Sequence, residues 1–346
     1  MRCTSKDETK REDLRRKKAR NQVIITITAV VLLTLAMVFL YFVFNRKQAV
    51  YHVTDYENKN YITTIEDNEL RGTNLCIAAD DVALEGFTGI DSLHGEALFD
   101  VTDNKVIFSN NMYERLYPAS TTKILTAYVT LKYGNLDEIV TVSESAVDLP
   151  FDAQICGLKA GDKVKLYDLL CGLLLYSGND AGNAIAEHIS GSVSAFADLM
   201  NEEALKLGAT DTHFVNPHGL HDEDHYTTVY DLYLIFNECL KYDVFNEIYS
   251  NESWTCDVES ADGSTVNHTW GATNYFSNGN ETIAPGYINN GGKTGTTDEA
   301  GSCLVLSSSF NEGKKCISII MGAETKSELY SEMNSMLEAG VIQLNN

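Results

Sequence analysis

A run of 22 residues without a charge, residues 23–44 (VIITITAVVLLTLAMVFLYFVF), divides this chain into two unequal parts. At about 1.5 Å of rise per residue, a helix of this length crosses a bilayer core of about 30 Å. Nine of the first 20 residues are Lys or Arg, so the N-terminus is expected to stay in the cytoplasm. The sequence therefore predicts a basic cytoplasmic segment (1–22), a single transmembrane helix (23–44) and an extracellular remainder.

A cleaved signal peptide is the competing interpretation of this run. The apolar region of a signal peptide is shorter and ends in small residues. Here the run ends in aromatic residues followed by Arg46 and Lys47, which favours an uncleaved anchor in the cell membrane. Residues 45–73 are polar and acidic without a strong period and are interpreted as a stalk, in which 51–53 and 61–63 could form short strands.

The charge of the chain follows the same division. The first 47 residues carry 11 basic and 4 acidic groups, and the whole chain has a net charge of −23, which leaves −30 for the remainder. Such an acidic part favours solubility and is a poor candidate for binding nucleic acid. The acidic part holds seven of the eight cysteines. Because seven is an odd number, at least one of them is expected to be unpaired in the chain. Cys171 and Cys303 lie in apolar runs and are expected to be small buried residues.

Three short motifs occur in the acidic part, in the order Ser120-Thr121-Thr122-Lys123, Ser177-Gly178-Asn179 and Lys293-Thr294-Gly295. Each motif alone is weak evidence for a functional site. The first could be an ordinary helix N-cap, the second a turn between two helices and the third simply a turn. The two serines that open the first and second motifs lie 57 residues apart, and the lysine of the third follows 116 residues later. This order and spacing would rarely arise by chance.

The first motif supplies a nucleophile and a base. A serine hydroxyl reacts poorly at neutral pH unless a neighbouring group takes its proton. The apolar spacing after Lys123 predicts a helix that ends at Gly134, and positions i and i+3 share a helix face. Lys123 is therefore expected to point at Ser120 and, partly desolvated near the second cation Lys293, to act as the general base.

The second motif places polar groups at a break between two apolar helical stripes, 166–174 and 181–189. From this turn, Ser177 could pass a proton to a leaving amine, and Asn179 could hold Lys123 and a substrate amide in place.

The third motif is predicted to lie at the start of a strand, on the edge that precedes two further predicted strands. These strands, 303–308 and 315–321, would be joined as a hairpin by an Asn-Glu-Gly turn at 311–313. Lys293 would add positive charge, and Thr294 would bind a substrate carboxylate. Gly295 would let the backbone come close to its neighbour.

Earlier strands are predicted at 97–101 and 105–108, followed by helices, the late strands and a final helix. This order predicts an α+β fold, with an antiparallel sheet flanked by helices, over a catalytic domain of residues 74–346.

Taken together, these motifs and their surroundings resemble the serine-type D-alanyl-D-alanine carboxypeptidases, the low-molecular-mass penicillin-binding proteins, which share their fold with serine β-lactamases. The resemblance covers roughly residues 74–342 and includes the segments EALFDVTDNKVIFSNNMYERLYPAS, FVNPHGLHDEDHYTTVYDL and KTGTTDEAGSCLV. It implies a sheet with a helical lobe, no metal or organic cofactor, peptidoglycan stem peptides as substrates and β-lactam antibiotics as covalent inhibitors.

The resemblance also implies a role for each motif residue. Ser120 forms an acyl-enzyme with the penultimate D-Ala while the terminal D-Ala leaves, with Lys123 as base. Ser177 and Lys293 resemble the proton-relay pair, and Asn179 resembles the orienting amide. The backbone N–H groups of Ser120 and Thr296 would form the oxyanion hole, and Lys293, Thr294, Gly295 and Thr296 would line the substrate site.

The chain departs from the family pattern at two places. Relatives often carry an arginine for the substrate's terminal carboxylate about a dozen residues before the glycine that ends the last helix, and this position is Leu329 here. Lys326 is close enough to replace it, but an ammonium group is not a bidentate fork. Many relatives also continue into a β-rich domain and a membrane-binding tail, whereas this sequence stops at Asn346.

Other interpretations stay open. His218, His221 and His225 have a spacing that could hold zinc, but Pro217 and Gly219 argue against a shared helix face. A β-lactamase would show a glutamate loop of the ExxLN type, which residues 202–206 do not supply. A penicillin-binding sensor or scaffold that is acylated without turnover is the non-enzymatic alternative.

Overall fold

The computed structural model describes residues 37, 74–89, 94–311 and 313–344. The chain divides into two units, Met1–Leu70 and Arg71–Asn346, and every helix and strand named below belongs to the second. Apart from Met37, the predicted cytoplasmic segment, transmembrane helix and stalk lie outside the described residues. Within the described part of the chain, no helix is both long and apolar enough to cross a membrane.

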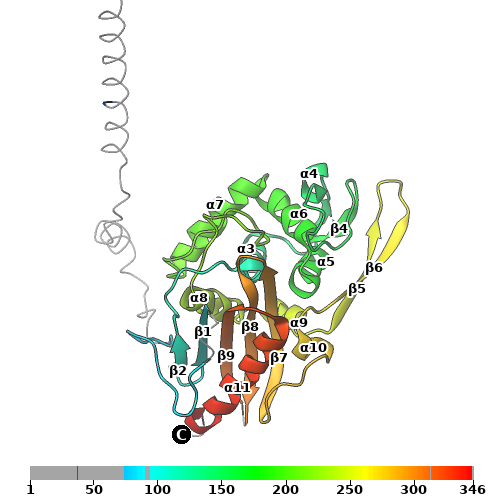
Figure 1. The fold of residues 1–346 in the computed structure, drawn as a ribbon. Helices are drawn as coiled ribbons and strands as arrows, with labels where there is room; N and C mark the ends of the chain where they lie inside the picture. The colour runs from blue at the N-terminus through cyan, green and yellow to red at the C-terminus, as the bar shows by residue number, and fades with distance from the viewer. Residues whose placement is uncertain (1–36, 38–73, 90–93, 312, 345–346) are drawn as a thin grey trace, which may run out of the picture. The chain divides into compact units, whose positions relative to one another are not determined.

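A five-stranded antiparallel sheet forms the base of this unit (Figure 1), in the order β2-β1-β9-β8-β7. The strands are β1 Gly95–Asp100, β2 Lys105–Asn110, β7 Tyr287–Thr297, β8 Gly301–Phe310 and β9 Lys314–Ala323. The four strands predicted from the sequence are confirmed, and each of their ends lies within two residues of the predicted one. The predicted turn is also present, because the backbones of Asn311 and Gly313 adopt the positive φ values of a tight turn. The motif strand β7 is the fifth and lies at one edge.

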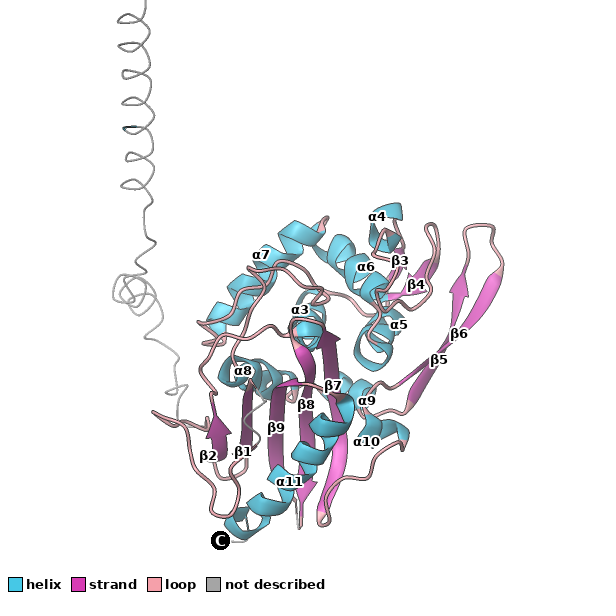
Figure 2. Ribbon diagram, viewed as in Figure 1, coloured by secondary structure: helices cyan, strands magenta, loops and turns pink. Residues whose placement is uncertain are grey.

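Apolar residues on both faces of this sheet are buried. Along β1, Ala97 and Phe99 join the core on the side of helix α8 (Val229–Cys239), whereas Leu98 joins a second core under helix α11 (Lys326–Leu344). Figure 2 shows α11 lying across its face of the sheet. Because successive side chains of a strand point to opposite faces, this alternation places the sheet between two helical layers, as the sequence predicted.

The remaining helices form a lobe around α3, whose first eight residues, Lys123 to Thr130, are all buried. Helix α3 packs against α6, α7 and α8 and so lies in the interior of this lobe (Figure 2). The elements of the lobe are a 3₁₀ turn Ala119–Thr122, α3 Lys123–Tyr133, α4 Glu144–Val147, α5 Leu166–Cys171, a π-helical turn Gly172–Tyr176, α6 Asn179–Ser190 and α7 Val193–Lys206.

The sequence analysis did not anticipate a second, four-stranded antiparallel sheet, in the order β3-β4-β5-β6. Its strands are β3 Ile139–Thr141, β4 Lys163–Lys165, β5 Ser253–Glu259 and β6 Thr265–Gly271; the nearby helices are α9 Asp243–Tyr249 and α10 Tyr275–Asn278. Strands of three residues carry too little periodicity to be recognised. In β5, however, Trp254, Cys256 and Val258 alternate with polar residues, which is the period-two signal of a strand.

All seven cysteines that the structure describes are buried and carry free thiols. Cys171 and Cys303 have no exposed surface, which confirms that they are small buried residues.

Candidate active site

The first motif lies on a 3₁₀ turn that runs directly into α3. This turn places Ser120 one helical turn before Lys123, and the Lys123 Nζ lies 2.8 Å from the Ser120 Oγ. The predicted pairing of these two side chains at i and i+3 is therefore present in the structure. Lys123 is completely buried, whereas Ser120 is partly exposed and open to a ligand.

Lys123 has two further partners, and both can only accept hydrogen bonds. Its Nζ lies 2.7 Å from the Asn179 Oδ1 and 2.6 Å from the His218 carbonyl oxygen. A neutral amine has two N–H groups and one lone pair. If the two N–H groups donate to these two oxygens, the lone pair faces Ser120, the one partner that carries a proton to give. The geometry thus orients a neutral Lys123 as a base for the serine.

The electrostatic setting favours this neutral form. Burial lowers the pKa of Lys123 well below its ordinary value, and the positive charge of Lys293 lowers it further. Lys293 is itself 2 % exposed, and burial lowers its pKa to about 7. A buried lysine in its neutral amine form can accept the proton of a serine.

The second motif forms the turn between the π-helical segment and α6. Ser177 adopts a left-handed backbone conformation with φ 66° and ψ 33°, which turns its side chain toward β7. The Lys293 Nζ donates to the Ser177 Oγ at 2.9 Å and to the Thr294 carbonyl at 2.8 Å. The three motifs are therefore joined in one cluster, with Asn179 on Lys123 and Ser177 on Lys293.

The third motif lies on a strand, as predicted, but in the second half of β7 rather than at its start, and β7 runs beside the first motif. A Cβ added to Gly295 would lie 2.8 Å from the Ser120 backbone nitrogen and 3.0 Å from the Pro118 carbonyl oxygen. Only a glycine permits this approach without displacing the backbone. The close backbone contact expected for Gly295 is thus present.

Two threonines of β7 flank Gly295 and are at least partly exposed. The Thr294 hydroxyl lies 2.6 Å from the hydroxyl of Thr273, a residue that the sequence analysis did not single out. Thr296 is exposed, and its hydroxyl donates to the Gly295 carbonyl at 2.8 Å. In a hydrogen bond between two hydroxyl groups, only one O–H donates. The other O–H of the Thr273–Thr294 pair is therefore available to a ligand.

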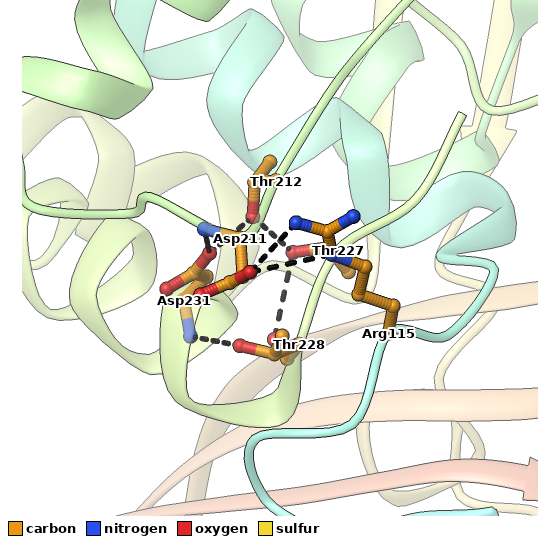
Figure 3. A network of polar contacts seen from close by, with 6 residues as sticks. All are labelled: Arg115, Asp211, Thr212, Thr227, Thr228 and Asp231. Atoms are coloured by element: carbon orange, nitrogen blue, oxygen red, sulfur yellow. Dashed lines mark hydrogen bonds and ion pairs between the residues drawn. The ribbon is translucent and has the colours of Figure 1, made fainter. Parts of the chain in front are cut away.

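A loop, residues 211–228, supplies the His218 carbonyl that Lys123 binds. Figure 3 shows the polar network that holds the ends of this loop. Buried Asp231 on α8 accepts from the Asp211 N–H at 2.9 Å and the Thr212 hydroxyl at 2.6 Å, and Arg115 pairs with Asp211 at 2.8 Å. The role of the His218 carbonyl cannot be predicted from the sequence, because a backbone group has no residue signature.

The three histidines of this loop do not converge. The His225 Nε2 bonds to the Thr122 hydroxyl at 2.8 Å, and its Nδ1 accepts from the Val215 N–H at 3.1 Å. The His218 Nδ1 accepts from the Leu220 N–H at 3.2 Å, and the His221 ring lies against Tyr117. Within the described residues, no group of three His, Cys, Asp or Glu side chains could hold a metal ion.

The position that relatives give to an arginine is part of the core here. Leu329 is a residue of α11, is 1 % exposed and packs into the second core between this helix and the sheet. The Lys326 Nζ lies over the Tyr275 ring, 5.6 Å from its centroid. No contact joins Lys326 to the motif residues within the described chain. In the residues that the structure describes, Arg115 is the only arginine, and it is bound to Asp211.

Comparison with known proteins gives consistent matches to one family. The family described as D-alanyl-D-alanine carboxypeptidase, peptidase family S11, matches residues 92–325. D-alanyl-D-alanine carboxypeptidase DacA of Haemophilus influenzae is 33 % identical over 253 residues, and DacF of Bacillus subtilis is 33 % identical over 249 residues. In both cases the match covers 70 % of this chain and 60 % of the relative, so the chain spans about 60 % of the length of these relatives.

Solved structures agree with this match. The DD-transpeptidase of Streptomyces K15 superposes with a TM-score of 0.68 at 28 % identity, over 74 % of this chain and all of that one. A D-alanyl-D-alanine carboxypeptidase from Mycobacterium tuberculosis gives a TM-score of 0.66 at 26 % identity, over 76 % of this chain and 96 % of that one. The arrangement of antiparallel sheets and helices is therefore that of known DD-peptidases.

Proposed function

Because this chain belongs to the D-alanyl-D-alanine carboxypeptidase family, we propose that it is a serine-type D-Ala-D-Ala carboxypeptidase that trims peptidoglycan stem peptides. In this proposal the Ser120 Oγ attacks the carbonyl of the penultimate D-Ala while Lys123 takes the hydroxyl proton. The bond to the terminal D-Ala breaks, and the leaving amine receives a proton from the Ser177 hydroxyl, which Lys293 replenishes. Water then hydrolyses the ester and releases the shortened peptide.

One observation carries the proposal above all others. The Lys123 Nζ touches the Ser120 Oγ at 2.8 Å while its other two partners, Asn179 and the His218 carbonyl, can only accept. This is the arrangement of a base with its lone pair directed at a nucleophile. A merely structural lysine would be expected to pair with a carboxylate, because a buried charge is otherwise expensive.

The position of β7 supports the rest of the reaction. Since the Gly295 Cα approaches the Ser120 backbone nitrogen closely, the N–H groups of Ser120 and Thr296 can together face the oxyanion of a bound ester or amide. The Thr273–Thr294 pair offers an O–H group for the terminal carboxylate, next to the positive charge of Lys293. The reaction requires no metal or organic cofactor.

The family assignment also suggests covalent inhibition by β-lactams, because a strained cyclic amide presents the same carbonyl to Ser120. The test uses full-length protein with a peptide ending in D-Ala-D-Ala and with a fluorescent penicillin. Release of D-Ala and labelling should both disappear in Ser120→Ala, whereas Ser264→Ala, at an exposed turn between β5 and β6, should keep both. Peptide mass mapping should find the penicillin adduct on Ser120.

Other outcomes of the same experiment point to other functions. Rapid penicillin hydrolysis with no D-Ala release would identify a β-lactamase, and stable labelling with neither reaction would identify a sensor or scaffold. Because the solved relative from Streptomyces K15 is named a DD-transpeptidase, a parallel reaction contains a free amine as acceptor. A new peptide bond formed in place of the free acid would make transfer, rather than hydrolysis, the main reaction.

The proposed site of action is the outer face of the cell membrane. The uncharged run 23–44 between the basic segment 1–22 and the stalk 45–73 supports an anchor with the catalytic domain (74–346) outside the cell, where peptidoglycan lies. Protease treatment of intact cells should degrade the catalytic domain and leave a tag at residue 1 intact. Recovery of the intact protein from washed cells, with degradation only after lysis, would contradict this topology.

A further inference from the structure

Asp180 follows the second motif directly and has no assigned role. Its carboxylate is 1 % exposed and makes no ion pair within the described residues. Four backbone N–H groups donate to it instead: those of Cys156 at 2.7 Å, Gly157 at 3.0 Å, Leu158 at 3.1 Å and its neighbour Ala181 at 2.9 Å. Such a set of donors stabilises an ionised carboxylate in the interior.

Through three of these bonds Asp180 holds the segment 154–158 against the Ser177–Asn179 turn. The Gln154 carbonyl in this segment accepts from the Asn179 N–H at 2.8 Å. The Cys156 thiol fills the space beside Gly178, where an added Cβ would lie 2.2 Å from the sulfur. The Cys156 carbonyl is fixed in turn by the Trp270 indole N–H at 3.1 Å. The segment therefore forms a wall behind the turn.

The turn needs such a wall because its backbone is strained. Ser177 adopts the left-handed conformation, which is unfavourable for a residue other than glycine. This conformation persists only where surrounding contacts impose it. It is also the conformation that carries the Ser177 hydroxyl to Lys293.

Asp180 also contributes charge to the neighbourhood of Lys123. The titratable groups that act on Lys123 are Lys293 from β7, His218 and His225 from the 211–228 loop, Cys156 from the wall and Asp180 from α6. Burial keeps both imidazoles neutral by lowering their pKa values, and it keeps the Cys156 thiol neutral by raising its pKa. Of these groups, Asp180 is the carboxylate, and it opposes the effect of Lys293 on Lys123.

We propose that Asp180 is a positioning residue for catalysis: it holds the Ser177–Asn179 turn in its strained conformation and sets the balance between the ammonium and amine forms of Lys123. The first part acts through the wall 154–158 and the second through charge. The inference rests on the proposed acylation of Ser120, because Lys123 matters to it only as the base for that serine.

The test replaces Asp180 and follows Ser120 acylation by fluorescent penicillin in the full-length protein between pH 5 and 10. Asp180→Asn cannot accept all four bonds and has no charge. We expect acylation to slow at least tenfold at the optimum. The acid limb of the pH profile should move down by about half a pH unit or more, because loss of a negative charge makes the ammonium form of Lys123 less stable.

A matched control is available in the same part of the chain. Asp162 is 3 % exposed and its carboxylate also accepts a backbone N–H, that of Lys159 at 2.8 Å, but it is not among the groups that act on Lys123. Asp162→Asn should leave the pH profile in place, even where it lowers the melting temperature. A purely structural role of Asp180 would make the two variants alike.

Asp180→Glu separates the two parts of the proposal and remains informative where Asp180→Asn does not fold. The longer side chain keeps the charge but displaces the wall, so the rate should fall while the acid limb stays at its wild-type pH. An Asp180→Glu variant with the wild-type rate, or a folded Asp180→Asn variant with the wild-type acid limb, would overturn the proposal. Failure of the proposed function would look different, since wild-type protein would then escape labelling or Ser120→Ala would still be labelled.

Discussion

The Nζ of Lys293 donates to the hydroxyl of Ser177 at 2.9 Å, although 116 residues separate them in the chain. Both side chains are buried, and neither has a carboxylate partner in the described residues. The site thus holds a lysine whose hydrogen bonds go only to a hydroxyl and a carbonyl. Such a residue favours reaction with a substrate at the expense of the stability of the free protein.

Replacement of Lys293 by methionine should stabilise the protein while it abolishes acylation. Burial lowers the pKa of Lys293 from 10.5 to about 7, so the unfolded chain binds more protons than the folded one between these values. Wild-type stability should therefore rise with pH across this window. After allowance for the two lost hydrogen bonds, we expect Lys293→Met to be about 2 kcal/mol more stable than wild type at pH 7.

Urea unfolding at pH 7 and pH 10 checks this expectation, with Ser120 labelling measured in parallel. The advantage of the variant should shrink at pH 10, because most of the window between the folded pKa of about 7 and the unfolded pKa of 10.5 then lies below the working pH. Lys315→Met, at a position on β9 that is exposed to solvent, serves as the control and should show little difference at either pH. A Lys293→Met protein that is less stable than wild type at pH 7 would contradict the argument.

Gly295→Ala should inactivate the site with little effect on the fold elsewhere. The new methyl group would lie 2.8 Å from the Ser120 nitrogen and 3.0 Å from the Thr121 nitrogen, so β7 and the 3₁₀ turn must move apart. A displacement of this size misaligns the nucleophile and the oxyanion donors, and we expect acylation to fall by roughly 100-fold or more. Gly271→Ala, whose Cβ would meet nothing within 4 Å, should acylate like wild type. Equal rates for the two variants would be evidence against a close functional pairing of β7 with Ser120.

Local rules explain which parts of this site could be predicted. The pairing of Ser120 with Lys123 follows from helix geometry over three residues, and the strands β8 and β9 follow from apolar runs around a turn. The left-handed backbone of Ser177 could not be predicted, because the wall 154–158 imposes it from another part of the chain. The His218 carbonyl reaches Lys123 across 95 residues, and no residue type signals such a contact.

The second sheet illustrates the same limit. Strands β3 and β4 have three residues each, so their pairing depends on neighbours rather than on their own pattern. The substitution of Leu329 for the family arginine was visible in the sequence, but its consequence was not. Only the packing of Leu329 into the core, with Lys326 over Tyr275, shows that neither residue contacts the motif residues.

Glu96→Gln should stabilise the protein above pH 7. Glu96 on β1 has no exposed surface, and among the described residues no group lies at good hydrogen-bonding geometry to either of its carboxylate oxygens. Burial and the nearby charge of Glu332 raise the pKa of Glu96 from 4.5 to about 7. The folded protein therefore binds more protons than the unfolded chain between pH 4.5 and 7, and wild-type stability falls as pH rises through this range.

Glutamine removes this penalty, so at pH 8 we expect Glu96→Gln to be about 2 kcal/mol more stable than wild type, with a much smaller difference at pH 4. Denaturant midpoints at the two pH values give the comparison. The exposed Glu85→Gln exchange removes the same charge without relieving burial and should be neutral at both. A difference that does not depend on pH would mean that Glu96 is not the group that titrates.

The network in Figure 3 should depend far more on Asp231 than on Arg115. Arg115 and Asp211 are each more than half exposed, at 56 % and 54 % of their side chains, so Arg115→Ala should cost less than about 1 kcal/mol. Asp231→Ala leaves the Asp211 N–H and the Thr212 hydroxyl without their buried acceptor and should cost about 2–4 kcal/mol. It should also slow acylation, because these bonds hold the loop that carries the His218 carbonyl.

Asp231→Asn is the informative comparison, because one amide oxygen can accept both bonds that the Asp231 Oδ2 accepts. Burial raises the pKa of Asp231 from 3.8 to about 6, so wild type loses stability as pH rises between these values while the asparagine variant does not. At pH 7.5 we expect Asp231→Asn to unfold within about 1 kcal/mol of wild type and to acylate at a similar rate. If Asp231→Asn were as damaging as Asp231→Ala, the charge of Asp231, rather than its hydrogen bonds, would be what holds the loop in place.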